Sequence, residues 1–276
     1  MMTELRFHKM QGAGNDFIVI DNRKYAFSLD QIIRFTPKLC DRKFGIGADG
    51  ILVLQQPQRD DVDFTMIYRN ADGSDAGMCG NGARCLVQYA HEIGFNATQT
   101  FNVHDNVYEA EVHPDGLVSI HFPVHVIPEK KVLEGRTFIK ADAATEHLVT
   151  FFDKKPELEN EEHLVQLGSS IRYHKTVDPP GSNVNFVFPE NESSIQLQTY
   201  ERGVEDLTLA CGTGALASAI ATHFHQGAST QHASYSVHVK GGTLKASFDF
   251  NADTNTYHQL ILTGPAHFVF EGTISI

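Results

Sequence analysis

The sequence predicts an α+β protein built from two copies of one structural unit. Two segments are nearly alike, 78–85 (MCGNGARC) and 210–215 (ACGTGA), and in each a cysteine directly precedes Gly-x-Gly and a helix-compatible run. These cysteines, Cys79 and Cys211, lie 132 positions apart. The other predicted elements recur in the same order at offsets of about 131–136 positions. Such a regular offset indicates a duplicated fold.

In the first half, strands alternate with two helices. A strand–turn–strand pattern over 7–21 surrounds the glycine-rich turn 12–16, and a helix follows with Ser28 as its N-cap. Pro37 leaves the second half of this helix uncertain. The remaining predicted elements are strands at 51–54 and 64–69, a helix from 79 to about 93, and strands at 107–112 and 117–122 joined by the turn 113–116.

The second half repeats this order. A strand pair over 138–152 encloses Ala144-Thr145-Glu146-His147. The elements predicted after it are a helix near 161–167, strands at 181–188 and 196–202, a helix from 211 to about 226, and strands at 235–239, 243–250 and 259–263. We expect an N-terminal α+β domain at 1–124, completed by 266–276, and a C-terminal domain at 125–265 that repeats the first.

The composition excludes several classes of protein. The 276 residues are 41% hydrophobic, which fits a globular chain, and the net charge of −12 argues against binding nucleic acid or an anionic membrane surface. No apolar run is long enough to span a membrane, and the N-terminal segment lacks the apolar core of a signal peptide, so we expect a cytoplasmic protein. Four cysteines in a chain of this length do not make a disulfide framework.

Two other patterns are rejected on their context. Gly45-x-Gly47-x-x-Gly50 matches the dinucleotide-binding pattern, but it follows a predicted helix and precedes a strand, the reverse of the required order. Cys79 and Cys85 do not have a usual zinc spacing, and no paired cysteine or histidine set accompanies them. We therefore expect neither a nucleotide nor a metal.

Two cysteines at two helix N-termini suit one kind of chemistry. A thiolate on one face of a carbon removes a proton and a thiol on the other face returns one, which inverts the stereocentre. The N–H groups around Gly80-Asn81 and Gly212-Thr213 would stabilise charge that develops on a neighbouring carboxylate. This scheme requires no cofactor. Cys40 and Cys85 lack the repeated context and are interpreted as small buried apolar residues.

A redox-sensing or non-catalytic thiol protein is the competing interpretation of the cysteine pair. Thiols with a lowered pKa also serve redox functions. The chain has no Cys-x-x-Cys motif, which weighs against this interpretation.

The motifs identify the chain as similar to one enzyme family. It resembles the diaminopimelate epimerases, pyridoxal-independent enzymes that interconvert LL- and meso-2,6-diaminopimelate in the biosynthesis of lysine and peptidoglycan precursors. The similarity extends over essentially the whole length. It rests on 12–17 (GAGNDF), 44–50 (FGIGADG), 70–74 (NADGS), 78–85 (MCGNGARC), 181–186 (GSNVNF), 200–203 (YERG) and 209–215 (LACGTGA).

The resemblance implies a fold and a set of roles. The fold would have two pseudo-symmetric domains, each a mixed β-barrel-like sheet around a central helix. Cys79 and Cys211 would be the acid/base pair, and His147 and Glu201 would orient the substrate or tune a cysteine. The implied substrate-binding residues are Asn15, Asn70, Gly80, Asn81, Asn183, Glu201, Arg202, Gly212 and Thr213. The family also implies a homodimer, with Phe270 at a subunit contact where a tyrosine is common.

One segment departs from the family pattern. Where the family commonly has Gly-Asn-Pro-His, this chain has Ala144-Thr145-Glu146-His147. The histidine is kept, but Thr145 has a hydroxyl in place of an amide and a shorter reach. This difference leaves open an alternative within the same class, an epimerase for a related amino acid.

Overall fold

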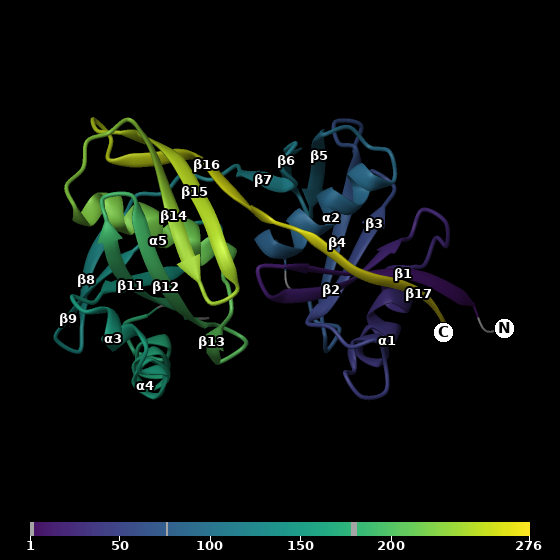
Figure 1. Cartoon of the computed structure of the whole chain (residues 1–276), viewed down its shortest axis with the longest axis horizontal. Helices are drawn as coiled ribbons and strands as arrows, with labels where there is room; N and C mark the ends of the chain where they lie inside the picture. The colour runs from purple at the N-terminus through teal and green to yellow at the C-terminus, as the bar shows by residue number, and fades with distance from the viewer. Residues whose placement is uncertain (1–2, 76, 178–180) are drawn as a thin grey trace. The chain divides into compact units, whose positions relative to one another are not determined.

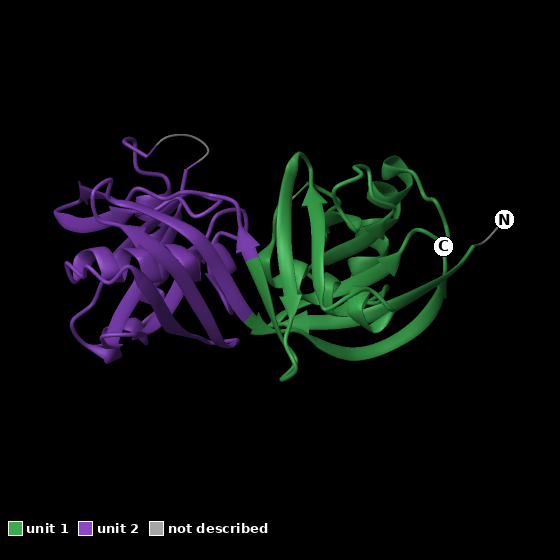
Figure 2. Cartoon of the chain, turned by 90° about the horizontal axis from the view of Figure 1, so that it is seen from above, with its two compact units in different colours: residues 1–120, 264–276 green, residues 121–263 purple. Residues whose placement is uncertain are grey.

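The computed structural model describes residues 3–75, 77–177 and 181–276 and consists of two compact units. Unit 1 comprises Met1–Ile120 with Gly264–Ile276, and unit 2 comprises His121–Thr263 (Figure 2). The chain passes from one unit to the other within two strands, β7 (Leu117–Phe122) and β16 (Thr256–Pro265). In the described part of the chain, no helix is both long enough and apolar enough to cross a membrane.

Unit 1 is a mixed sheet that surrounds one helix (Figure 1). Its other elements are β1 (Glu4–Gly12), β2 (Asn15–Asp21), α1 (Leu29–Cys40), β3 (Gly50–Gln55), β4 (Phe64–Asn70), α2 (Gly80–Glu92), β5 (Thr98–Val103), β6 (Asn106–Val112) and β17 (His267–Ser275). Pairing is antiparallel for β1–β2, parallel for β2–β3, antiparallel for β3–β4, parallel for β4–β5 and antiparallel for β5–β6.

Unit 2 repeats this sequence of pairings. Its other elements are β8 (Glu129–Leu133), β9 (Arg136–Lys140), β10 (His147–Phe151), α3 (Lys155–Leu158), α4 (Glu161–Arg172), β11 (Asn183–Asn191), β12 (Ser194–Glu201), β13 (Asp206–Thr208), α5 (Gly212–His225), β14 (His232–Val239) and β15 (Gly242–Asn251). Pairing is antiparallel for β9–β10, parallel for β10–β11, antiparallel for β11–β12, parallel for β12–β14 and antiparallel for β14–β15. The matching order confirms the predicted duplication and the α+β class.

The central helix of each unit is buried because the sheet curves around it. In unit 1, α2 packs against β1, β2, β3, β4 and β6, and in unit 2, α5 packs against β10, β11, β12, β14 and β15. Every residue of α5 from Gly212 to His223 is buried. A helix that is apolar on all sides is stable only in such an enclosed position. Each unit is therefore the mixed β-barrel-like sheet around a helix that the resemblance implies.

The outer helices α1 and α4 close a core on the other side of each sheet. Ser28 caps α1, as predicted, and the structure adds a capping box with Gln31. On the inner face of α1, Ile32, Phe35 and Leu39 pack onto the sheet of unit 1. The helix continues through Pro37 to Cys40, because a proline in the last turn removes only one helical hydrogen bond.

The alternation of the sequence does not reveal every strand. Strand β17 pairs antiparallel with β1 along most of its length, although Phe268, Val269 and Phe270 at its start are exposed. Its side chains do not alternate between buried and exposed, so periodicity alone gives no signal for it. Strands β5, β8 and β13 were also not predicted.

Candidate functional site

Cys79 and Cys211 occupy equivalent positions at the starts of the two central helices. Each is the N-cap residue, with φ and ψ of −115° and 114° for Cys79 and −122° and 113° for Cys211. In each, the carbonyl oxygen accepts the first helical hydrogen bond, from Ala83 at 2.8 Å and from Ala215 at 2.9 Å. The two repeated motifs therefore form the same local structure, with a sulfur beside the positive end of a helix dipole.

The second glycine of each motif is required by packing. A Cβ atom on Gly82 would lie 2.8 Å from Cδ2 of Leu52 on β3, and one on Gly214 would lie 2.7 Å from Oδ1 of Asn185 on β11. Both distances are shorter than side-chain atoms tolerate. The glycines thus allow each helix start to approach the equivalent strand of its own unit closely.

The sulfur atoms have different neighbours. The Gly82 N–H donates to Sγ of Cys79 at 3.4 Å, whereas the side chain of Cys211 makes no such capping bond and lies 3.7 Å from Oγ1 of Thr213. Cys79 is half-buried and Cys211 is buried. The two cysteines therefore share a backbone geometry without sharing an electrostatic environment.

Asn15 and Asn81 are linked in unit 1, which joins the start of β2 to the start of α2. Ala13 and Gly14 both have positive φ, 53° and 97°, and they make the tight turn that places Asn15 at the beginning of β2. The Asn81 amide donates to Oδ1 of Asn15 at 2.6 Å, and the Asn15 amide donates to Asp49 at 3.2 Å. The amide of Asn15 is thus held in one orientation.

A cluster of charges supports this arrangement. Arg42 bridges Asp16 and Asp49 with contacts of 2.6 and 2.8 Å, and the largely buried Lys9 pairs with Asp16 at 2.8 Å. Although burial alone would raise the pKa of Asp16, hydrogen bonds and charge from Arg42 and Lys9 lower it to about 2. Asp49, which orients Asn15, and its neighbour Asp16 are therefore balanced locally by two cations.

His147 is wholly buried in unit 2, in a network of neutral groups. Its Nδ1 accepts a hydrogen bond from the Asn185 amide at 3.0 Å, so the ring carries its proton on Nε2. Nε2 lies 2.8 Å from Oγ1 of Thr145 and 3.0 Å from Oγ1 of Thr213. Because Thr199 donates to the Asn185 carbonyl, the orientation of that amide is fixed as well. The network connects His147 through Thr213 to Cys211.

Burial keeps His147 neutral. It lowers the pKa of this side chain to about 3, with a smaller contribution from the charge of Arg202. His147 is therefore a fixed hydrogen-bonding group at neutral pH and does not supply a positive charge to Cys211.

This shift predicts a loss of stability in acid. Because a histidine in the unfolded chain has a pKa near 6.5, the unfolded state binds one more proton than the native state between about pH 6.5 and 3, and stability falls as the pH falls through that range. The His147→Gln variant should lose about 2 kcal/mol less unfolding free energy than the parent between pH 7 and pH 5. Urea unfolding at both pH values measures this. The same change at the exposed His163 is the control, and equal pH dependence in all three proteins would contradict the prediction.

Asn183 begins β11, and Arg202, which directly follows β12, lies beside it. The Arg202 N–H donates to Oδ1 of Asn183 at 2.9 Å, and the Asn183 amide donates to the carbonyl of Glu146 at 3.1 Å. The Arg202 guanidinium pairs with the Glu146 carboxylate at 2.6 Å and also donates to the carbonyl of Gly181. A pocket of about 340 Å³ adjoins this group and is lined in part by Thr145 and Glu146.

The other two predicted binding residues end equivalent strands. Asn70 is the last residue of β4, where its amide donates to Oγ of Ser74 at 3.0 Å. Glu201 is the last residue of β12, and its carbonyl accepts from Val204 and Glu205 in the turn that follows. The structure thus gathers the predicted residues of unit 1 around the start of α2 and the ends of its neighbouring strands. It does the same around α5 in unit 2.

Sequence reasoning missed several residues of these networks, among them Asp49, Asn185, Thr199 and Arg84, whose guanidinium donates to Oδ1 of Asn81. Asn185 lies two positions after Asn183 on a buried strand and therefore shares a face with it, which is a signal that the sequence does contain. Arg84 is buried within the repeated motif, where no local pattern reveals its burial. Among the residues that the structure describes, no group of three or more His, Cys, Asp or Glu side chains could hold a metal ion.

Comparison with known families gives a match over nearly the whole chain. The family model described as diaminopimelate epimerase matches residues 7–119 and 139–269. The chain is 38% identical to a diaminopimelate epimerase of Flavobacterium psychrophilum, with 98% of this chain and all of that protein covered. It is 36% identical to one of Aquifex aeolicus, with 98% of each protein covered.

Solved structures share the fold at low sequence identity. A phenazine biosynthesis protein of Bacillus anthracis matches with a TM-score of 0.76 and 12% identity over the full length of both chains. A hydroxyproline epimerase of Agrobacterium vitis matches with a TM-score of 0.74 and 14% identity, covering 99% of this chain and 92% of that one. At these identities the likeness establishes the fold alone.

Proposed function

Because the chain belongs to the diaminopimelate epimerase family, we propose that Cys79 and Cys211 invert one stereocentre of diaminopimelate by a two-base mechanism. The observation that carries the proposal is the equivalent placement of the two sulfurs, each on the N-cap residue of a buried central helix. We also propose that each unit acts as a domain that contributes one of the two proton-transfer groups.

The chemistry divides between the sulfurs and the backbone. One cysteine, as the thiolate, removes the α-proton, and the other, as the thiol, donates a proton to the opposite face of the same carbon. Between these two proton transfers, negative charge develops on the carboxylate beside that carbon. Donors at the starts of α2 and α5, from Gly80-Asn81 and Gly212-Thr213, are suited to stabilise this charge.

The distal end of the substrate is itself an amino acid, with a carboxylate and an ammonium group. We assign the carboxylate to Arg202, whose guanidinium is already held by Gly181 and Glu146, and the ammonium to Glu201. Asn15, Asn70 and Asn183 would supply hydrogen bonds around them. A substrate without the distal groups would leave these polar side chains unpaired, which is a strong basis for selectivity.

Exchange of the α-proton with solvent tests the reaction. In deuterium oxide, LL-diaminopimelate should acquire deuterium at the α-carbon as the meso isomer accumulates, with no cofactor added. Nuclear magnetic resonance and chiral chromatography follow the two events. Isomerisation without incorporation of solvent deuterium would contradict proton transfer through exchangeable thiols.

The pair between Glu146 and Arg202 predicts an effect on substrate affinity. In this chain the Glu146 carboxylate occupies the guanidinium that the substrate carboxylate would bind. The Glu146→Gln variant removes that competitor, and its KM for diaminopimelate should fall about two- to fivefold, the range expected for a partly exposed ion pair. Steady-state kinetics measures this, with Glu159→Gln at an exposed position as the matched control. A rise in KM would instead assign Glu146 to binding the substrate ammonium.

Thr145, where this chain departs from the family pattern, is the reason to test related amino acids as substrates. Its hydroxyl bonds His147 and Thr213 and lines the pocket beside Glu146. A panel of diaminopimelate and related amino acids, compared by kcat/KM, would separate a diaminopimelate epimerase from an enzyme of wider range. We expect diaminopimelate to have the highest value.

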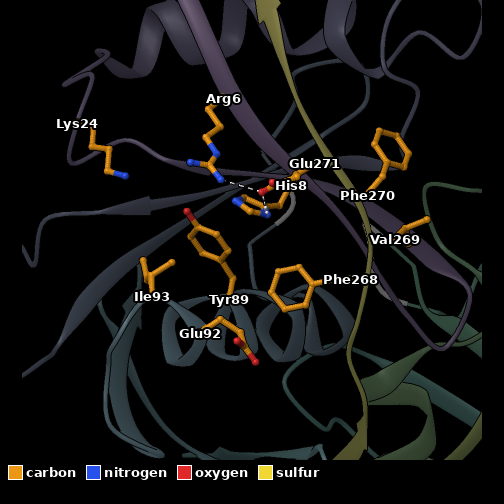
Figure 3. Close-up of a pocket in the computed structure, with 10 residues that line it drawn as sticks. All are labelled: Arg6, His8, Lys24, Tyr89, Glu92, Ile93, Phe268, Val269, Phe270 and Glu271. Atoms are coloured by element: carbon orange, nitrogen blue, oxygen red, sulfur yellow. Dashed lines mark hydrogen bonds and ion pairs between the residues drawn. The ribbon is translucent and has the colours of Figure 1, made fainter.

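We also propose that the chain forms a homodimer through the outer face of β17. Phe268, Val269 and Phe270 are 41, 56 and 50% exposed, and they border a pocket of about 410 Å³ lined also by Tyr89 and Ile93 (Figure 3). Large apolar side chains in a row on a strand favour burial against a second copy. Sedimentation should give a mass twice the 30.6 kDa of the chain, and a monomer at micromolar concentration would contradict this.

A cytoplasmic location is proposed on the basis of the substrate. Diaminopimelate serves the biosynthesis of lysine and of peptidoglycan precursors, as the resemblance implies. Cell fractionation followed by immunodetection tests this location.

A further inference from the structure

Arg84 is a wholly buried cation that the proposed reaction does not use. It lies on the first turns of α2, and its side chain has no exposed surface. Its guanidinium donates to the carbonyl of Pro265 at 3.2 Å, to the carbonyl of Gly80 at 3.3 Å and to Oδ1 of Asn81 at 2.8 Å. All three acceptors are neutral. Arg84 forms no ion pair with any residue that the structure describes.

A buried charge without a counter-charge is costly, so an ionisable neighbour that can carry the opposite charge is stabilised by it. Burial lowers the pKa of Arg84 to about 10, which still leaves it protonated at neutral pH. Two cysteines, Cys85 and Cys79, would raise this pKa in their thiolate form. Burial raises the pKa of Cys85 to about 12, so Cys85 remains a neutral thiol. Cys79 is the one of these two with solvent access.

The position of Arg84 directs its charge toward the start of the helix. Two of its three bonds hold Gly80 and Asn81, the residues that directly follow Cys79. The sulfur of Cys79 also accepts the Gly82 N–H. A cation and a donated hydrogen bond both favour the charged form of a thiol.

The strands that pack against α2 bring charges that are already balanced or are exposed to solvent. On β1 and β2, Lys9 and Asp16 form an ion pair. Asp49, which precedes β3, is connected to Arg84 by a chain of hydrogen bonds through the amides of Asn15 and Asn81. On β4, Arg69 faces Asp75 at 3.7 Å. The acids of β6, Glu109 and Glu111, are exposed. The ring of His8 on β1 lies 4.9 Å from that of Tyr89 on α2, tilted by 52°.

At the position equivalent to Arg84, unit 2 has an apolar residue. Leu216, which is buried, lies five positions after Cys211, as Arg84 does after Cys79. Thr213 and His147, which are linked to Cys211, are neutral at physiological pH. Arg202 pairs with Glu146.

We propose that the buried guanidinium of Arg84 favours the thiolate form of Cys79, so that Cys79 is the base of the resting enzyme and Cys211 is the acid. The assignment of base and acid rests on the proposed two-thiol function. The difference in pKa between the two thiols does not, because it rests on the buried charge of Arg84. Arg84 is a positioning residue, because it acts through Cys79.

Alkylation by iodoacetamide as a function of pH measures each thiolate, with mass spectrometry identifying the modified cysteine. In the native chain, the alkylation midpoint of Cys79 should lie at least about one pH unit below that of Cys211. In the Arg84→Met variant, the Cys79 midpoint should rise by about one unit or more while that of Cys211 stays unchanged. Leu216→Met, the same side chain at the equivalent position of unit 2, should leave both midpoints unchanged.

If Arg84→Met does not fold, Arg84→Lys retains the charge and should keep the Cys79 midpoint within about half a unit of the parent. A Cys79 midpoint in the native chain equal to or above that of Cys211 overturns the proposal without any variant. Because alkylation requires no turnover, this outcome is distinct from failure of the two-thiol mechanism, which would appear as epimerisation by a chain lacking Cys211.

Discussion

Replacing Cys211 by alanine is expected to reduce epimerisation of diaminopimelate about 10³-fold or more, and replacing Cys79 should do the same. Inversion needs one group on each face of the α-carbon, so neither cysteine can substitute for the other. The backbone donors at the starts of α2 and α5 do not depend on the sulfurs. Each variant should therefore still bind substrate, as isothermal titration calorimetry would show.

Proton exchange distinguishes a missing base from a damaged site. A variant with one remaining thiol has a base on one face of the α-carbon only. In deuterium oxide it should still exchange the α-proton of the isomer whose proton lies on that face, without inverting the centre. Cys40→Ala is the matched control, because Cys40 belongs to the core beneath α1 and burial raises its pKa to about 12. Epimerisation at the parent rate by Cys211→Ala would contradict the two-base mechanism.

Replacing Arg202 by methionine is expected to lower kcat/KM for diaminopimelate about 100-fold. The guanidinium is the cation that we assign to the distal carboxylate, and its backbone N–H and side chain connect it to Asn183, Gly181 and Glu146. Lysine keeps the charge but loses the planar fork, so Arg202→Lys should restore only part of the loss. Steady-state kinetics on LL-diaminopimelate measures both.

The control for Arg202 is Arg136→Met in the same unit. The guanidinium of Arg136 lies 4.6 Å from the centroid of the Phe152 ring and takes no part in the networks around α5. Its loss should affect stability more than turnover. An unchanged kcat/KM for Arg202→Met would assign the distal carboxylate to another residue and leave the two-thiol mechanism intact.

Local sequence predicted the regular elements well because helices and hairpins depend on nearby residues. The capping box of Ser28, the turn before Asn15 and the two N-cap cysteines are all determined within about four residues of the chain. Strand β17 was missed because its order comes from pairing with β1, more than 250 positions away in sequence, and not from a buried face of its own.

The individual contacts of the site could not be predicted from local sequence. The family resemblance implies site roles for Asn15, Asn81, His147 and Thr213, and these roles stay predictions. It did not show that Asn81 donates to Asn15 or that Thr213 contacts His147. Each pair joins a strand to a helix about 66 positions away. Such contacts depend on how the sheet curves around the helix, which no local pattern encodes.

By itself, the sequence determined that this protein is a duplicated α+β fold with one cysteine at the start of each buried helix, and which family it belongs to. Repetition and capping are local properties, and they can be read directly along the chain. Only the tertiary structure decided that Arg84 is buried among three neutral hydrogen-bond acceptors, that His147 is neutral and that Glu146 pairs with Arg202. These are consequences of desolvation and of contacts between distant segments, because the charge state of a side chain depends on everything packed around it.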